Sequence, residues 1–250
     1  MARLVLGTNI NNTGTSSTVV EKPVPMPYSI QKVLDANGKL INGSTLMDFT
    51  GVTDVGDHAL HFEYNNVNFP ENTEINFPSL ISMTGDSCCS YMFSGCKQII
   101  SANFPVLEKI SASDACQSMF SSCDLTSINF PALEKISASQ ACRFMFSSCK
   151  KLTIVEFPSL SDIKSSFCCR YMFYYCTSLT SLSFPALTSS SFGTNRNQFD
   201  NLIGGVTGCT IHFPSNLDPE SGSTVISSLT GYPNFAGTDT VLAFDLPATE

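Results

Sequence analysis

The sequence predicts an α/β solenoid with a parallel β-sheet on one face, short helices on the other and a cap at each end. Three observations predict it. Several motifs recur at one period of about 27 residues, the apolar pattern within each repeat changes from a strand spacing to a helix spacing, and the repeat degenerates at both ends.

Four sequence columns share one register. Phe-Pro recurs from Phe77 onward at steps of 27, 26, 27, 27 and 29 residues, and Met-Phe recurs at steps of 27, 26 and 27. Two cysteine columns keep the same phase: Cys89, Cys116, Cys142, Cys169 and Cys96, Cys123, Cys149, Cys176. The period lies within the range of leucine-rich repeats. We therefore predict a right-handed leucine-rich-repeat solenoid over residues 71–214.

Each repeat is predicted to contain a strand, a turn and a helix. After Leu125, Ile128 and Phe130 alternate with polar residues, which is the spacing of a strand with one buried face. Pro131 has no amide hydrogen to donate and ends the strand. Apolar residues then follow at i, i+1, i+4, i+5 and i+8, the stripe of a short helix: Ala141, Cys142, Met145, Phe146 and Cys149.

The segments outside the repeats divide the chain further. Residues 1–27 are rich in Thr, Asn, Ser and Pro and are predicted to be an extended arm that anchors the protein. Residues 28–70 carry a broken repeat and are predicted to form the N-terminal cap. Residues 215–250, with a closing strand over 240–246, are predicted to form the C-terminal cap.

Composition excludes several classes of protein. The 250 residues carry a net charge of −8, and the pI near 4.8 without basic runs argues against nucleic acid as a partner. A hydrophobic content of 42% excludes general disorder. No apolar run is long enough for membrane insertion, and the apolar stretch at the start is too short for a secretory signal. We expect folding in a cytoplasm.

The 11 cysteines are spaced poorly for disulfides or zinc. The two columns lie seven residues apart, about 10 Å on a helix, whereas a disulfide needs Cα atoms within about 7 Å. Zinc sites favour a shorter Cys-to-Cys spacing. The columns are therefore expected to fill the core as small apolar residues. Cys88, Cys168 and Cys209 lie outside the columns and are the candidates for a reactive thiol.

Signatures of catalysis are missing from the sequence. It has no nucleophile elbow, phosphate loop, His-Glu-x-x-His motif or dinucleotide fingerprint. His58 and His61 are three residues apart, which gives a weak metal signal beside the simpler interpretation of ordinary cap residues. We predict a non-enzymatic protein without a cofactor or a metal.

The outward positions of the predicted strands are the best candidates for a contact surface. The residue before Phe-Pro forms one row: Asn76, Asn103, Asn129, Glu156, Ser183 and His212. A second row, two residues earlier, supplies Ser101, Ser127 and Ser181. Stacked strands bring such residues within about 5 Å of each other. The rows are interpreted either as a solvated sheet face or as a surface that contacts a glycan or a protein.

Aromatic residues gather on the predicted helix side. Tyr171, Tyr174 and Tyr175, with Tyr91 and Phe144, are candidates for a patch that contacts a sugar or a neighbouring subunit of a homo-oligomer. Core packing is the alternative interpretation of these side chains.

The repeat resembles that of the BspA-like leucine-rich repeat family. The resemblance rests on Ile-x-Phe-Pro-x-Leu-x-x-Ile followed by Ala-Cys-x-x-Met-Phe-x-x-Cys, as in the unit that ends at Cys149, and it covers residues 71–214. It implies a leucine-rich-repeat fold and, as in many members, a bacterial cell-surface protein that binds host proteins or other cells.

The chain is also similar to repeat proteins encoded by phages and prophages of gut bacteria. The likeness lies in residues 1–7, in the segment from Tyr28 and in Val-Leu-Ala-Phe-Asp-Leu-Pro at 241–247. It implies a virion component, in a tail fibre, head fibre or decoration protein, that is made in the host cytoplasm. Residues 1–27 would bind other virion proteins, and the solenoid would contact a host surface protein or glycan. The alternative is a BspA-like adhesin on the bacterial surface.

Overall fold

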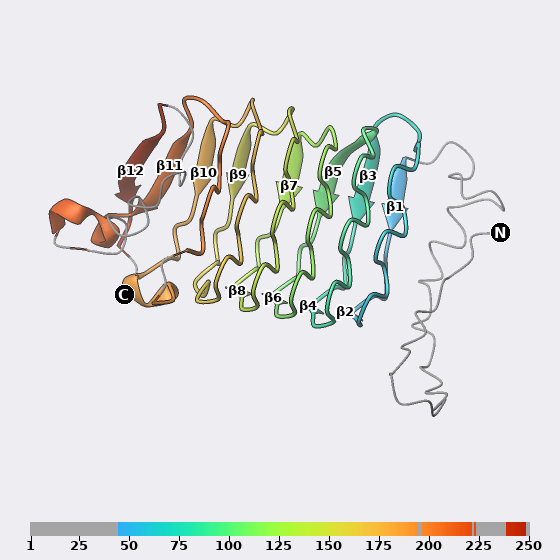
Figure 1. Cartoon of the computed structure of the whole chain (residues 1–250), viewed down its shortest axis with the longest axis horizontal. Helices are drawn as coiled ribbons and strands as arrows, with labels where there is room; N and C mark the ends of the chain where they lie inside the picture. The colour runs from blue at the N-terminus through green and yellow to red at the C-terminus, as the bar shows by residue number, and fades with distance from the viewer. Residues whose placement is uncertain (1–44, 195–196, 222, 224–238, 249–250) are drawn as a thin grey trace, which may run out of the picture.

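The computed structural model describes residues 45–194, 197–221, 223 and 239–248. These residues form a parallel β-solenoid of about seven turns, elongated along the stacking axis (Figure 1). The predicted repeat solenoid is thereby confirmed. Each turn of the solenoid, called a coil below, has three sides that stack on the same sides of its neighbours.

The first side is a wall of parallel strands, called the sheet wall. Within the described residues it contains β1 (Leu46–Asp48), β3 (Thr73–Asn76), β5 (Ile99–Asn103), β7 (Ser127–Asn129), β9 (Ile154–Glu156), β10 (Ser181–Ser183), β11 (Thr210–Pro214) and β12 (Val241–Leu246). The hydrogen-bonded sheets β1-β3-β5-β7 and β9-β10-β11-β12 meet where β7 lies beside β9 (Figure 1). The strand predicted to close the C-terminal end is confirmed as β12.

The second side is a ladder of shorter parallel strands. It contains β2 (Asp54–Val55), β4 (Ser82–Met83), β6 (Lys109–Ile110) and β8 (Lys135–Ile136). Isolated bridges from Lys135 to Asp162 and from Ile163 to Phe192 extend it by two further coils. Short 3-10 helices follow near the C-terminal end: η2 (Ser189–Ser191), η3 (Ser215–Leu217) and η4 (Pro219–Ser221).

The third side corrects the sequence prediction, because the described residues contain no α-helix. The segments predicted as helices are runs of overlapping turns, called the turn ribbon: 56–67, 85–96, 112–123, 138–149, 165–176 and 197–206. Along the ribbon, the amides alternate between two acceptors. Met145 donates to the carbonyl of Cys142 in its own coil at 3.2 Å, and Phe146 donates to the carbonyl of Met172 in the next coil at 2.9 Å.

Left-handed backbone at every fourth residue explains why a helix does not form. Gln140, Phe144 and Ser148 have φ of 56°, 54° and 61°, and the other segments repeat this pattern. A helix needs negative φ throughout. Each fourth residue instead reverses the chain, so the backbone groups find partners in the next coil and stay satisfied. The turn ribbon repeats every four residues, and an α-helix repeats about every 3.6 residues. Over only two such periods, the five apolar positions of each repeat are compatible with both structures.

Two ladders of aromatic rings run through the core along the stacking axis. Phenylalanines beside the sheet wall stack at centroid distances from 4.1 to 6.0 Å: Phe49, Phe77, Phe104, Phe130, Phe157, Phe184, Phe213 and Phe244. A second ladder under the turn ribbon runs from Tyr64 through Phe93 to Phe173. Each coil therefore buries its apolar face only against its neighbours.

All 11 cysteines are buried and free, which confirms them as core residues. The second column also serves the backbone. Cys123 donates its thiol hydrogen to the carbonyl of Phe93 at 3.1 Å, and Cys149 donates to the carbonyl of Phe120 at 3.1 Å. Cys88, Cys168 and Cys209, the candidates for a reactive thiol, are buried as well, and burial raises the pKa of Cys209 to about 11.

The predicted ends are described only in part. The arm over 1–27 and the first part of the N-terminal cap lie outside the described residues. The remainder of that cap, from residue 45, forms a complete coil with β1, β2 and the first ribbon segment. In the C-terminal cap, residues 222, 224–238 and 249–250 lie outside the described residues.

Candidate contact surfaces

The outward residues of the sheet wall form the two rows that the sequence predicted. Strand register places Asn76 opposite Asn103 and Asn103 opposite Asn129, and places Glu156, Ser183 and His212 opposite one another farther along. This first row, with Asp48 at its start, is called the amide row. The second row pairs Ser101 with Ser127 and places Ser181 beside Ile154 and Thr210.

The asparagines of the amide row form a ladder of side-chain hydrogen bonds. Asn129 Nδ2 donates to Asn103 Oδ1 at 2.9 Å, Asn103 Nδ2 donates to Asn76 Oδ1 at 3.0 Å, and Asn76 Nδ2 donates to Asp48 Oδ1 at 3.3 Å. An amide offers two N–H donors and an oxygen with two lone pairs, so each carboxamide retains capacity beyond the ladder. Because the ladder fixes their orientation, the amides present an ordered array to a contacting molecule.

The C-terminal half of the amide row carries ionisable groups. Glu156 is exposed, and the Nδ1 atom of half-buried His212 lies 2.9 Å from both carboxylate oxygens of Asp245 in β12. Sequence reasoning missed Asp245. The register pairs His212 with Ala243, two residues before Asp245, and it shifts between His212 and Pro214.

The second row combines hydroxyl groups with aliphatic side chains. Ser127 is exposed, and Ser101 and Ser181 are half-buried. Ile154, in the same row, exposes 56% of its surface, and Val241 at the end of the row exposes 55%. Polar and apolar side chains thus lie side by side on this part of the wall, as they do at many protein contact surfaces.

The three candidate tyrosines come together on the turn ribbon, on a different side of each coil from the amide row. The rings of Phe144 and Tyr171 stack at 4.5 Å with an interplanar angle of 2°. Tyr174 meets Tyr171 edge-on at 5.3 Å and Tyr175 edge-on at 4.5 Å. Tyr175 is exposed and the others are half-buried, so these rings belong to the surface and not to the core.

Two arginines complete this surface. The guanidinium of Arg143 lies over the Phe144 ring at 5.0 Å, and that of Arg170 lies over the rings of Tyr171 at 4.7 Å and Phe167 at 4.9 Å. We call the following residues the aromatic–arginine patch: Arg143, Phe144, Arg170, Tyr171, Tyr174 and Tyr175. The signal available in the sequence is an arginine directly after the cysteine in two successive repeats.

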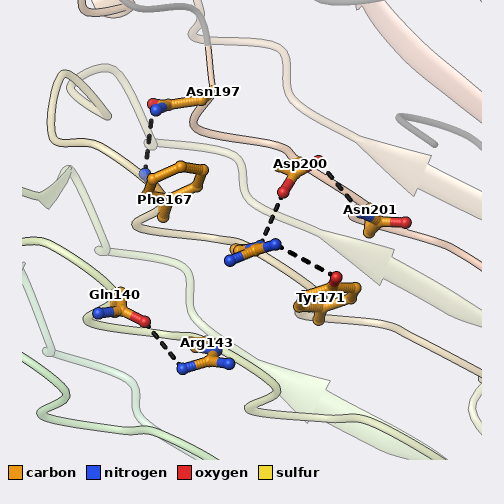
Figure 2. A network of polar contacts seen from close by, with 8 residues as sticks. Gln140, Arg143, Phe167, Tyr171, Asn197, Asp200 and Asn201 are labelled. Carbon is orange, nitrogen blue, oxygen red and sulfur yellow. Dashed lines mark hydrogen bonds and ion pairs between the residues drawn. The ribbon is translucent and has the colours of Figure 1, made fainter. Parts of the chain in front are cut away.

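Polar contacts hold the arginines in place (Figure 2). Arg170 Nε lies 2.7 Å from Asp200 Oδ2, and the same guanidinium donates to the hydroxyl of Tyr171 at 3.3 Å. Arg143 donates to Gln140 Oε1 at 2.9 Å. Arg170 therefore has a charged partner in the next coil, whereas Arg143 bonds the neutral side-chain amide of Gln140.

Glycines make room for the outer tyrosines. A Cβ atom at Gly204 would lie 2.9 Å from the Tyr174 ring, and one at Gly205 would lie 3.0 Å from the Tyr175 ring. The two rings therefore lie directly against the backbone of the following coil, where any other residue would displace them.

His58 and His61, near the N-terminal end of the solenoid, contact each other through their rings. The rings of His58 and His61 meet edge-on at 5.6 Å, and burial, with the nearby His58, lowers the pKa of His61. Among the described residues, no group of three or more His, Cys, Asp or Glu side chains is arranged to hold a metal ion. The same residues include no helix long and apolar enough to cross a membrane.

Comparisons of the chain with models of protein families, with curated proteins and with solved structures found no match.

Proposed function

We propose that this protein is a non-enzymatic binding and structural component of a phage virion, in a tail fibre, head fibre or decoration protein, and that its repeats are leucine-rich repeats of the BspA-like type. In this proposal residues 1–27 attach the chain to other virion proteins, and the solenoid contacts a host protein or glycan outside the particle.

The observation that carries the proposal is the ordered polar surface along the sheet wall. The amide row fixes hydrogen-bonding groups on successive coils, at 2.9 Å and 3.0 Å between neighbouring asparagines. Stacked coils hold such a row rigidly, so a ligand would meet it without a large loss of conformational entropy. A surface of this kind suits recognition of an extended partner such as a glycan chain or a protein edge.

The state of the thiols supports a binding role. A catalytic cysteine needs access to substrate and a lowered pKa. Here burial raises the pKa of Cys123 and Cys149, and it raises the pKa of Cys176 to about 12. All 11 thiols of the chain are therefore committed to the core.

The direct test is mass spectrometry of phage particles that have been induced from the source strain and purified by density gradient. Peptides of this chain should copurify with the capsid and tail proteins, and a chain lacking residues 1–27 should be absent from particles while its repeats stay folded. Normal incorporation of the truncated chain would refute the anchor role. Recovery only in the bacterial surface fraction would replace the virion proposal with the adhesin.

A further inference from the structure

We propose that the aromatic–arginine patch binds an acidic glycan through a sugar ring that bears a carboxylate. The patch lies on the turn ribbon and not on the sheet wall. The proposal therefore concerns a second site, and it does not depend on whether the chain is a virion component.

The first argument is that folding does not require the aromatic rings. Phe144 and Tyr171 have φ of 54° and 56°, a left-handed conformation that is unfavourable for bulky residues. Ser118 and Asn201 have φ of 52° and 53° at the matching positions of other coils, where small polar residues suffice. The ribbon needs the left-handed backbone at this position but not an aromatic side chain, so the rings of Phe144 and Tyr171 are available for contact with a ligand.

The second argument is the shape of the surface that the rings make. The rings of Phe144 and Tyr171 lie almost parallel in their stack at 4.5 Å, and Tyr175 exposes 48% of its surface. The face of an aromatic ring carries partial negative charge and packs well against the weakly positive C–H groups on one face of a sugar. The tyrosine hydroxyl groups lie at the rim of these rings, where they can bond the hydroxyl groups of the sugar.

The third argument is charge. Phe144 donates its amide to the carbonyl of Arg170 at 3.1 Å, so the two arginines lie on adjacent coils. Asp200 partners Arg170 at 2.7 Å, whereas Arg143 lies on a ring and bonds Gln140. The Nε atom of Arg143 is buried, so an external carboxylate would bind the outer Nη groups of the guanidinium. A planar guanidinium that is held in this way suits a carboxylate, which it binds through paired hydrogen bonds.

Acidic groups near the patch restrict where the ligand can bind. Asp200 occupies the side of Arg170, and the charge of Arg143 also acts on Asp114, where it opposes the rise in pKa that burial causes. The carboxylate of the ligand is therefore assigned to the Arg143 end of the patch, and the sugar ring to Phe144 and Tyr171.

The chain offers a matched control for the arginine. Phe62 and Tyr91 stack at 4.7 Å with an interplanar angle of 6°, at the positions that correspond to Phe144 and Tyr171 three coils away. The residues before them are His61 and Ser90 in place of the two arginines. If stacked rings alone bound the ligand, both pairs would contribute.

The test is isothermal titration calorimetry of the full chain with two carboxylated probes and their neutral counterparts. The probes are 3′-sialyllactose against lactose, and a galacturonate tetramer against its methyl ester. We expect at least one acid to bind about tenfold or more tightly than its neutral counterpart. Preference for 3′-sialyllactose would indicate a host-type glycan. Preference for the galacturonate tetramer would indicate a uronate polysaccharide.

Two substitutions at the patch and one at the control pair locate the site. Arg143→Gln and Phe144→Ser should each weaken binding about tenfold or more, and Phe62→Ser should leave it unchanged. Serine already occupies this position at Ser118, and thermal melting establishes that each variant is folded. The proposal fails if neither acid binds, if acid and neutral probes bind equally, or if Phe62→Ser weakens binding as much as Phe144→Ser.

Discussion

At the scale of single residues, cysteine is suited to this fold because it is small, apolar and a weak donor. Cys96 and Cys176 donate to the carbonyls of Tyr64 and Phe146 in the preceding coil, both at 3.0 Å. A serine at these positions would bring a more polar group into the core, and an alanine would leave a gap without a donor. This dual role explains the two columns without invoking disulfides or zinc.

The thiols should react only after unfolding. All 11 are buried and free, so the native chain should consume almost no Ellman's reagent, and the denatured chain should consume 11 equivalents without prior reduction. Fast reaction of several thiols in the native state, or fewer than 11 in the denatured state, would contradict the packing described above.

Stability should fall in alkaline solution for the same reason. Burial raises the pKa of Cys96 to about 11 and of Cys176 to about 12, so the folded chain keeps protons that the unfolded chain loses above about pH 8.5. The stability that these protonated thiols contribute is complete below about pH 8.5, and it is lost as the pH rises through the pKa values of the folded chain. Melting under reducing conditions from pH 7 to 10 measures the slope, which should be shallower for Cys176→Ala.

Glycine at position 85 is required by close approach between coils. A Cβ atom there would lie 2.1 Å from the carbonyl carbon of Gly56 and 2.3 Å from the amide nitrogen of Asp57. Both are backbone atoms and cannot rotate away, so Gly85→Ala should lower the free energy of unfolding by about 1–3 kcal/mol.

Gly56→Ala is the matched control for this substitution. A Cβ atom at Gly56 would have no atom within 4 Å, so the change in the free energy of unfolding should stay within about 0.5 kcal/mol. Urea denaturation of both variants measures the difference, and equal stability of the two would show that the first two coils are not packed as described.

At the scale of elements, the amide ladder ties successive strands of the sheet wall together. Asn103→Ala would remove the partner of both Asn76 Oδ1 and Asn129 Nδ2. Water can replace part of this bonding, so the expected loss in the free energy of unfolding is about 0.5–1.5 kcal/mol. Ser101→Ala, on the same strand but in the second row, should change it by less than about 0.5 kcal/mol. Indistinguishable denaturation curves for the two variants would mean that the ladder adds nothing.

The turn ribbon is the element that sequence reasoning got wrong, and the physical cause is specific. Ala141, Cys142, Met145, Phe146 and Cys149 are all buried, so the apolar stripe was identified correctly. The backbone beneath it was not, because left-handed residues at this spacing are mostly not glycine: they include Gln140, Phe144 and Ser148. Glycine is the usual sequence signal for positive φ, and where other residues adopt it the sequence does not indicate a left-handed backbone.

At the scale of the whole molecule, the repeat period determined most of what could be predicted. Phe-Pro marks where each strand ends, and Asn103 and Asn129 face each other because the strand register follows the repeat. Contacts that depend on departures from the repeat could not be predicted. Asp245 lies two residues beyond Ala243, the register partner of His212, beside a shift in the register, and the approach of Gly205 to Tyr175 occurs in a coil whose sequence has degenerated.

The same stacking decides which surfaces are available for binding. Because two faces of each coil pack against neighbouring coils, recognition is left to the outward sides, where the amide row and the aromatic–arginine patch lie on different walls of one rigid stack. The two surfaces can be tested separately, since Asn103 and Arg143 have different hydrogen-bond partners, Asn76 and Gln140.

Backbone NMR of the isolated chain tests the architecture most directly. The couplings and chemical shifts of residues 138–149 distinguish left-handed from helical backbone. Left-handed values are predicted at Gln140, Phe144 and Ser148, with cross-coil contacts from Phe146 to Met172. An unbroken run of helical values over this segment would contradict the turn ribbon, and with it the surface on which the aromatic–arginine patch is built.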